Sequence, residues 1–376
     1  MKLILLLLDG IGDRSYPILD HRTPLQAAHT PNLDRLAQRG CNGLYHAAIP
    51  GQCLPSETAH FLLFGYPLDR FPGRGLLEAV GDGVPFDKDD VLLLAHLTSI
   101  SWQTRVPILT HGRRDIQGDP REIEPLYQSM SVFNTGQIRF RLHQTHFNDA
   151  ILVAKGPVSP YVSDSDPMRT GRPVARVSPL SGNPEPEKST RTAQALNRYL
   201  SHCHRALSAH DVNRRRMDAG LPPANFLTTL RSGRRIIQMP FEERWGLSGM
   251  VIASGGVYGG LAHELRLDFR RAQDTEDVGR DLQKRIGLAL GDTDHDFVHV
   301  HTKAPDEAGH AGDPEHKRAV ITRLDQGLNE LVGAVEMRND VLVAVTADHS
   351  TPSGSTLIHS GEPVPMTIVG PGVRRR

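Results

Sequence analysis

Short apolar runs recur along the chain, and each of them ends in polar or glycine residues. A short run that is apolar at successive positions is typical of a strand buried on both faces in a parallel sheet. The runs that fit this description are 3–10, 249–256, 296–303 and 340–350. The first of them predicts a buried parallel strand over residues 2–8.

Helix-like stretches lie between these runs, at 30–40, 277–290 and 317–335. Thr30 and Pro31 supply the N-cap and the first helical residue of the earliest stretch, and a glycine follows its end. Strands that alternate with helices predict an α/β fold, with a mostly parallel sheet and helices on both faces. Ligand sites in such sheets form where the strands end at their carboxyl edge.

The middle of the chain has a different pattern. Residues 96–188 combine strand-like alternation with a turn-rich tract that holds many prolines, which predicts a smaller α+β insertion. Residues 189–220 have a strongly helical pattern and are expected to return the chain to the core. The predicted domains are therefore a core of residues 1–95 and 189–376 and an inserted domain of residues 96–188.

The composition of the chain limits the classes of molecule that it is expected to bind. Lys+Arg and Asp+Glu both total 43 in 376 residues, so the formal net charge is zero and nothing suggests a nucleic-acid partner. Only six apolar residues separate Lys2 from Asp9, fewer than the roughly 7–15 of a signal peptide. No run approaches the ~18 apolar residues of a membrane span.

Three widely spaced cysteines fit a reducing cytoplasm. We expect a cytoplasmic protein without a membrane partner; a homo-oligomer is left open.

Carboxylates and histidines gather at the predicted strand ends. Asp9 ends the first run, and "TADHS" places Asp348 and His349 at the end of the last. Asp306 and His310 are four residues apart, so on a helical turn they face the same way and are able to bind one metal ion. Each motif taken alone also fits a polar loop or a structural histidine. The candidate ligands are Asp9, Asp306, His310, Asp348, His349 and His359, which are enough for two divalent metal ions.

Ser56, in "CLPSETAH", precedes an apolar run that predicts a helix. Taken alone, a serine at this place is interpreted as the N-cap of that helix. Two metal ions about 4 Å apart change this interpretation, because they clamp a phosphoryl group and lower the pKa of a coordinated hydroxyl. Ser56 is therefore a candidate nucleophile for phosphoryl transfer, and a helix that begins there adds N–H groups for phosphate oxygens.

Several stretches resemble the archaeal-type cofactor-independent phosphoglycerate mutases of the alkaline phosphatase superfamily. They are "LLLDGIGDR", "TPLQAAHTPNLDRLAQRG", "PSETAHFLLFGY", "GRGLLEAVGDGV", "HTKAPDEAGHAGD", "VTADHSTP" and "HSGEPVPMTIVGPGV". The resemblance implies a metal-binding alkaline phosphatase-like core with an inserted cap domain that closes over the substrate. It also implies a phosphorylated Ser56 and two ions of manganese, zinc or magnesium. One ion would be held by Asp9, Ser56, Asp348 and His349, and the other by Asp306, His310 and His359.

The chain departs from this family at positions that contact the substrate. The family's Arg-x-Asn-Phe run is "LLLAHLTSI" here, its Asp-Arg-x-Ala-Gly-Arg segment is reduced to "HGRRDIQGD", and its Gly-Tyr-Arg-His motif is "HQTHFNDAI". A lysine expected near "VYGGLA" is Gly259. Arginine supplies planar two-point contacts to phosphate and carboxylate, so other residues must replace the lost ones. The candidates are Arg74, Arg105, Arg113, Arg114 and Arg139, with Lys303 and Arg74 as the expected substrate contacts.

The sequence thus predicts a two-metal enzyme that acts on a small phosphorylated metabolite through phospho-Ser56. Interconversion of 2- and 3-phosphoglycerate is the first substrate prediction. The altered substrate positions favour two alternatives: a phosphatase or phosphoesterase in which water completes the reaction, and transfer to another small hydroxyl acceptor such as homoserine. A fourth hypothesis is a degenerate family member that serves as a binding or structural protein.

Overall fold

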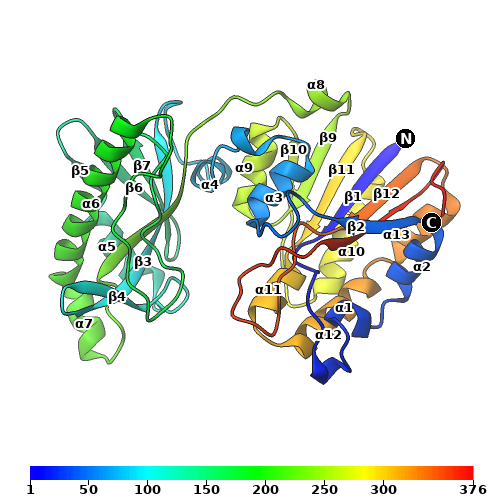
Figure 1. Ribbon diagram of the computed structural model, residues 1–376, viewed down its shortest axis with the longest axis horizontal. Coiled ribbons are helices and arrows are strands. Elements are labelled where there is room, and N and C mark those ends of the chain that lie inside the picture. The colour runs from blue at the N-terminus through cyan, green and yellow to red at the C-terminus, as the bar shows by residue number, and fades with distance from the viewer. Residues whose placement is uncertain (376) are drawn as a thin grey trace. The chain divides into compact units, whose positions relative to one another are not determined.

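The computed structural model describes residues 1–375 and divides the chain into two compact units. The first unit contains Met1–Phe71 and the chain from Ile237 onward, and the second contains Pro72–Ile236 (Figure 1). Both chain ends therefore belong to the first unit. No helix of residues 1–375 is both long and apolar enough to cross a membrane.

The first unit is built on a seven-stranded sheet in the order β10-β9-β11-β1-β12-β13-β2. The strands are β1 (Lys2–Leu8), β2 (Cys41–Tyr45), β9 (Gly249–Ala253), β10 (Asp268–Arg271), β11 (Phe297–Thr302), β12 (Val341–Thr346) and β13 (Val364–Val369). β10, β9, β11, β1 and β12 are parallel, and β13 and β2 are antiparallel to their neighbours. The predicted mostly parallel sheet is confirmed, with β1 at its centre.

Helices cover both faces of this sheet. They are α1 (Pro24–Ala27), α2 (Pro31–Arg39), α3 (Ser56–Leu63), α8 (Phe241–Trp245), α9 (Gly256–Glu264), α10 (Val278–Gly291), α11 (Ala304–His310), α12 (Pro314–Gln326) and α13 (Asn329–Met337), with short 3-10 turns at Pro17–Leu19 and Leu68–Arg70. Ile4, Leu6 and Leu8 of β1 pack into one apolar core with α10, α12 and α13. The opposite face carries α3 and α9, where Phe64 lies edge-on against His299 of β11. β1 is apolar on both faces because both faces are covered.

The predicted helix 317–335 is two helices, α12 and α13, separated at Gly327. A Cβ at Gly327 would lie 2.3 Å from the carbonyl oxygen of Gly279, at the start of α10. Only a residue without a side chain allows α10 and α12 to approach this closely. The glycine therefore serves the packing of two helices, and a new helix begins after it.

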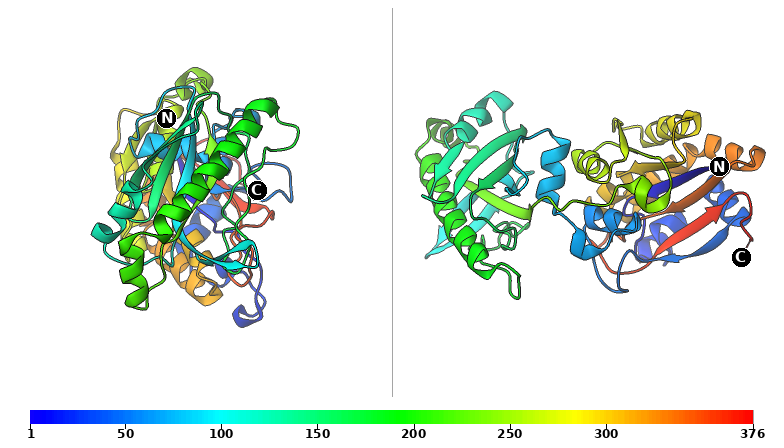
Figure 2. Two further views of the ribbon diagram at one scale, coloured as in Figure 1. Left: turned by 90° about the vertical axis from the view of Figure 1, so that its left-hand side faces the viewer. Right: turned by 90° about the horizontal axis from the view of Figure 1, so that it is seen from above.

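The second unit is an antiparallel sheet with its own helices. Its strands are β3 (Val91–Gln103), β4 (Val106–His111), β5 (Val132–Asn134), β6 (Arg139–His146), β7 (Asp149–Lys155) and β8 (Phe226–Gly233). Its helices are α4 (Arg74–Gly81), α5 (Pro120–Gln128), α6 (Pro186–Ser208) and α7 (Asp211–Asp218). α6 crosses one face of this sheet and buries Leu196, Tyr199 and Cys203 against it (Figure 2). This is the α+β insertion that the pattern of the middle of the chain predicts.

The boundaries of this unit differ from the predicted positions 95/96 and 188/189. β3 runs through residue 95 without a break and pairs with β7 and with β8, so its first residues belong to the second unit. α6 and α7 do not return the chain to the core either, since β8 follows them in the second sheet. Hydrophobic pattern alone could not place these boundaries, because an apolar strand such as "VLLLAHL" fits either sheet.

Candidate metal-binding active site

Ser56 is the first residue of α3, and Pro55 in extended conformation occupies the N-cap position. The interpretation of Ser56 as the N-cap is therefore wrong, whereas a helix that begins at Ser56 is confirmed. The Ser56 hydroxyl lies 2.9 Å from Nε2 of His349 and is hydrogen-bonded to it. The side chain is thus directed at a histidine from a distant part of the chain.

Asp9 and the Asp348–His349 pair follow β1 and β12, which are adjacent parallel strands. The carboxyl ends of adjacent parallel strands meet at one sheet edge, which brings these residues together. Nε2 of His349 lies 3.1 Å from Oδ2 of Asp348 and 3.5 Å from Oδ1 of Asp9. Ser56, Asp9, Asp348 and His349 therefore form one cluster, as the sequence predicts.

Asp306 and His310 are on α11, which follows β11, the other neighbour of β1. Oδ1 of Asp306 lies 3.3 Å from Nε2 of His310, one helical turn away, and 3.4 Å from Nε2 of His359. One ligand atom from each of these three residues lies within 4.8 Å of the others. The same holds for Asp9, Asp306 and His349, so Asp306 joins both groups, whereas the sequence assigns it to one.

Asp306 stays ionised in this surrounding. Burial alone would raise the pKa of its carboxyl group, but hydrogen bonds from His310 and His359 outweigh burial and hold that pKa well below its usual range. Its side chain is 1% exposed. A buried carboxylate of this kind requires positive charge nearby.

Burial and nearby charges also act in opposite directions on the pKa values of Asp348 and His349. Burial opposes the ionisation of Asp348, but the charge of His349, whose Nε2 lies 3.1 Å from Oδ2 of Asp348, outweighs burial and keeps the pKa of Asp348 well below the usual range. Burial would also lower the pKa of His349, but the carboxylates of Asp348 and Asp9 raise it to about 9. Without a metal ion, the positive charge of His349 thus balances part of the negative charge of Asp348 and Asp9.

Two buried carboxylate oxygens of the site indicate whether its residues suit a metal ion. Oδ1 of Asp9 and Oδ2 of Asp348 are buried and accept no hydrogen bond within the described residues. Leaving a buried carboxylate oxygen unpaired costs more than a typical hydrogen bond stabilises. A cation that these oxygens coordinate removes this cost, and a donor set of carboxylates and imidazoles suits zinc or manganese. The residues therefore fit divalent metal ions.

Comparison with known proteins agrees with this geometry. A sequence model described as the metalloenzyme superfamily matches residues 1–376. A 2,3-bisphosphoglycerate-independent phosphoglycerate mutase of Methanocaldococcus jannaschii is 40% identical over all of this chain and 86% of its own length. The corresponding mutase of Methanopyrus kandleri is 36% identical over all of this chain and 89% of its own. The chain belongs to the 2,3-bisphosphoglycerate-independent phosphoglycerate mutase family of the metalloenzyme superfamily.

Solved structures agree with this membership. A protein from Pyrococcus horikoshii matches with a TM-score of 0.76 and 28% identity over all of this chain and 89% of its own. A cofactor-independent phosphoglycerate mutase from Thermoplasma acidophilum matches with a TM-score of 0.61 and 31% identity over all of this chain and 91% of its own. The predicted α/β core with a mostly parallel sheet and an inserted α+β domain is confirmed.

A second layer of residues fixes Asp9, and sequence reasoning did not select it. His301 of β11 and Tyr258 of α9 both bond to Oδ2 of Asp9, each at 3.0 Å. Neither of these bonds involves Oδ1 of Asp9, the atom that a bound cation would contact. The signal for His301 is its place in "DFVHVHTK" beside a predicted ligand, but no local pattern identifies Tyr258, which is 249 residues from Asp9.

His60 and Thr351 support the site in the same way. Nδ1 of His60 lies 2.7 Å from the carbonyl oxygen of Ser56, one turn earlier in α3. Complete burial lowers the pKa of His60 to about 4, so this histidine is neutral. The Thr351 hydroxyl donates to Oδ1 of Asp306 at 2.7 Å. The spacing of four residues between Ser56 and His60 was the available sequence signal.

Lys317 of α12 connects two of the loops that carry the candidate ligands. Its side chain is fully buried, and its ammonium group donates to the carbonyl oxygens of Gly10 at 2.8 Å, Gly12 at 3.0 Å and Thr351 at 2.7 Å. It also lies 3.1 Å from Oδ2 of Asp13. The Lys317–Asp13 pair therefore joins the loop after β1 to the loop after β12.

The residues predicted to contact the substrate lie in different parts of the fold. Lys303 lies next to a candidate ligand, with its Nζ 3.6 Å from Oδ2 of Asp306. Arg74 belongs to the second unit, in α4, where it pairs with Glu78 at 2.6 Å. Arg113 and Arg114 line a cavity of about 580 Å³ within the second unit. A Cβ at Gly259 would lie 3.0 Å from the Phe269 ring, so a lysine at this place would require the ring to move.

Proposed function

We propose that the protein is a metal-dependent phosphoglycerate mutase that interconverts 2- and 3-phosphoglycerate through phospho-Ser56. The observation that carries this proposal is the Ser56 hydroxyl, 2.9 Å from His349 and at the meeting point of buried carboxylates from the ends of β1 and β12. The mutase names of the full-length relatives support the choice of substrate.

The proposed site holds two divalent metal ions, of manganese, zinc or magnesium. Asp9, Ser56, Asp348 and His349 form one ligand set and Asp306, His310 and His359 the other, and the convergence of these side chains supports this assignment. When bound, the ions neutralise phosphoryl charge and lower the pKa of the serine hydroxyl.

The chain's own groups perform the transfer. The Ser56 oxygen forms a bond to phosphorus as the bond from phosphorus to the phosphoglycerate oxygen breaks, and the proton of the serine hydroxyl passes to the departing glycerate. The oxygen of the other glycerate hydroxyl then bonds to the same phosphorus as the bond from phosphorus to the Ser56 oxygen breaks, and the proton of that hydroxyl passes to the Ser56 oxygen. Ser56 is thereby restored, and the phosphate has moved by one carbon. The N-terminal end of α3 favours the negative charge that Ser56 acquires. Water must be excluded in the interval, or phospho-Ser56 is hydrolysed.

Ser56→Ala tests the mechanism. We expect loss of mutase activity with 3-phosphoglycerate in the presence of manganese, while the bound-metal content falls by less than it does in Asp306→Asn. Intact-protein mass spectrometry of rapidly quenched wild-type enzyme should show one added phosphoryl group, which Ser56→Ala lacks. Full activity of Ser56→Ala would contradict the proposal.

A second function, phosphate release, is favoured by the rewritten substrate positions and above all by Gly259, which the Phe269 ring covers. If the glycerate is held less firmly after transfer, water reaches phospho-Ser56 and the product is inorganic phosphate. Transfer of the phosphoryl group to another small hydroxyl acceptor would occur in the same way, with that hydroxyl in place of water. Incubation with 3-phosphoglycerate and with p-nitrophenyl phosphate, with 2-phosphoglycerate and free phosphate both measured, separates these outcomes.

We further propose that the enzyme works in the cytoplasm on a small phosphorylated metabolite, without a nucleic-acid or membrane partner. Cys41, Cys53 and Cys203 are free thiols, which supports a reducing compartment. The zero net charge supports a small-molecule substrate.

A further inference from the structure

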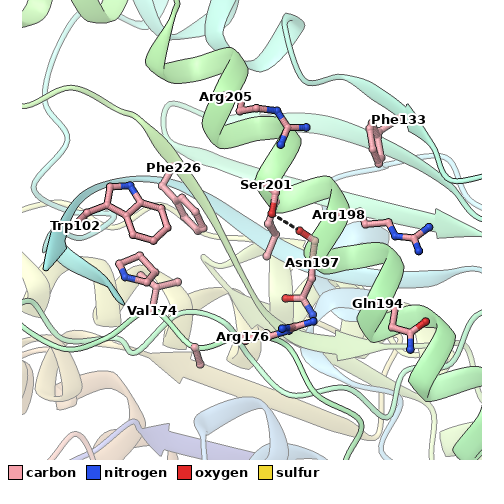
Figure 3. A pocket seen from close by; sticks show the side chains of 13 residues that line it. Trp102, Phe133, Val174, Arg176, Gln194, Asn197, Arg198, Ser201, Arg205 and Phe226 are labelled. Carbon is pink, nitrogen blue, oxygen red and sulfur yellow. Dashed lines mark hydrogen bonds between the residues drawn. The ribbon is translucent and has the colours of Figure 1, made fainter. Parts of the chain in front are cut away.

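A groove in the second unit, separate from the residues proposed to bind metal, has a volume of about 910 Å³ (Figure 3). One exposed face of α6 lines it, together with the ends of β3 and β8. Its floor is apolar, since Val174, Leu200 and Phe226 are buried. A cavity of several hundred Å³ with an apolar floor and a few polar groups is the usual form of a small-molecule site.

The rim of the groove carries uncompensated positive charge. Arg176, Arg198 and Arg205 line it, and none of its lining residues is an aspartate or glutamate. Within residues 1–375 none of the three arginines makes an ion pair, although many other arginines of the chain do. Three guanidinium groups around one groove, in a chain of zero net charge, indicate a ligand with more than one negative charge.

Trp102 forms an aromatic wall of the groove and is 55% exposed. Its position is fixed, because the indole N–H donates to Nε2 of His204 at 3.2 Å and Nδ1 of His204 is bonded to the carbonyl oxygen of Asn225 at 2.8 Å. An exposed indole that is held in place offers a planar surface for stacking and loses little entropy when a ring binds.

We propose that this groove binds a free nucleotide, with its base against Trp102 and its phosphates between Arg198 and Arg205. A nucleotide is the class of ligand that combines a planar ring with several negative charges in a volume that the groove accepts. A nucleic-acid strand is disfavoured because its affinity depends on many phosphate contacts along a basic surface, and the chain as a whole is neutral. The groove is a binding site in addition to the proposed active site, and its test does not depend on catalysis.

The chain has two tryptophans, Trp102 and Trp245, so Trp245→Phe leaves Trp102 as the only indole. ADP added to the full-length protein with this substitution should quench the Trp102 fluorescence with saturation. Arg205→Gln or Arg198→Gln in this background should weaken ADP binding by about tenfold or more, because each removes charged hydrogen bonds to phosphate. Arg191→Gln is the matched control: Arg191 is also exposed on α6 and pairs with Glu187, but it does not line the groove.

Adenosine and inorganic pyrophosphate should each bind more weakly than ADP, since each supplies only half of the contacts. Thermal midpoints of the arginine variants should match that of the parent, so that weaker binding cannot be attributed to unfolding. Absence of saturable quenching by ADP at millimolar concentration, or equal loss of affinity in Arg191→Gln and Arg205→Gln, overturns the proposal. Tighter binding of a single-stranded oligonucleotide, or a dimer that Trp102→Ala dissociates, would assign the groove to another partner instead.

Discussion

Replacing Lys317 with methionine is predicted to destabilise the protein by roughly 3–5 kcal/mol, the range measured when one partner of a buried ion pair is removed. Methionine keeps a stem of similar length but leaves the Asp13 carboxylate without its counter-charge at 3.1 Å. The carbonyl oxygens of Gly10 and Thr351 also lose their ammonium donor, at about 1 kcal/mol each. Burial of an ammonium group is itself unfavourable and lowers the pKa of Lys317, so part of this loss is recovered.

The assay is urea unfolding followed by circular dichroism, in which a lower midpoint at unchanged slope reports a loss of stability alone. A companion variant, Lys317→Met with Asp13→Asn, removes both charges. Its loss in the free energy of unfolding should be smaller, by at least 1 kcal/mol, than the sum of the losses in Lys317→Met and Asp13→Asn. The reason is that Asp13 is costly only when it is charged and has no counter-charge. Additive single effects, or a loss below 1 kcal/mol in Lys317→Met, would refute the argument.

The same substitution should also weaken metal binding by about 10- to 100-fold, the usual effect of losing a group that positions a ligand. Lys317 fixes the loop after β1, and the backbone N–H of Gly10 in this loop donates to Oδ1 of Asp348 at 3.1 Å. Manganese titration by calorimetry measures the effect without any activity assay. An unchanged affinity in a folded Lys317→Met protein would limit the lysine to a role in stability.

Three further predictions concern single contacts. Tyr258→Phe removes one of the two bonds to Oδ2 of Asp9, so manganese affinity measured by calorimetry should fall by about tenfold, with little change in thermal midpoint. Asp325→Ala removes the carboxylate that accepts the first backbone N–H groups of α2, and urea unfolding should show a loss of about 2 kcal/mol. Burial opposes the ionisation of Asp292, but the Lys2 ammonium at 2.8 Å outweighs burial and lowers the pKa of Asp292 to about 2. This stabilisation, on the order of 1–2 kcal/mol, is present above pH ~4 and disappears as the pH falls towards 2, and Asp292→Asn should flatten that part of the unfolding free energy.

The sequence predicted those parts of the site that follow from local pattern. Asp9 and Asp348 end apolar runs, and such runs become adjacent parallel strands, so their meeting at one edge follows from the fold class. Asp306 and His310 are one helical turn apart and converge wherever that helix lies. Thr30 and Pro31 correctly marked the start of α2, but the first N–H groups of this helix bond to Asp325 from α12 and not to Thr30. A local signal thus placed the helix but not its partner.

Contacts that join distant segments had no such signal. Lys317 and Asp13 are 304 positions apart, and a lysine on a helix is ordinarily solvated, so nothing in "EHKRAV" distinguishes one that is fully buried. The Phe269 ring over Gly259 is likewise a property of the packing of α9 against β10, although it decides whether the family's lysine has room. The candidate metal ligands are therefore predictable because each is placed by the strand or turn that carries it. The residues that hold those ligands in position, and those that select the substrate, depend on which elements pack together, and only the folded chain supplies that information.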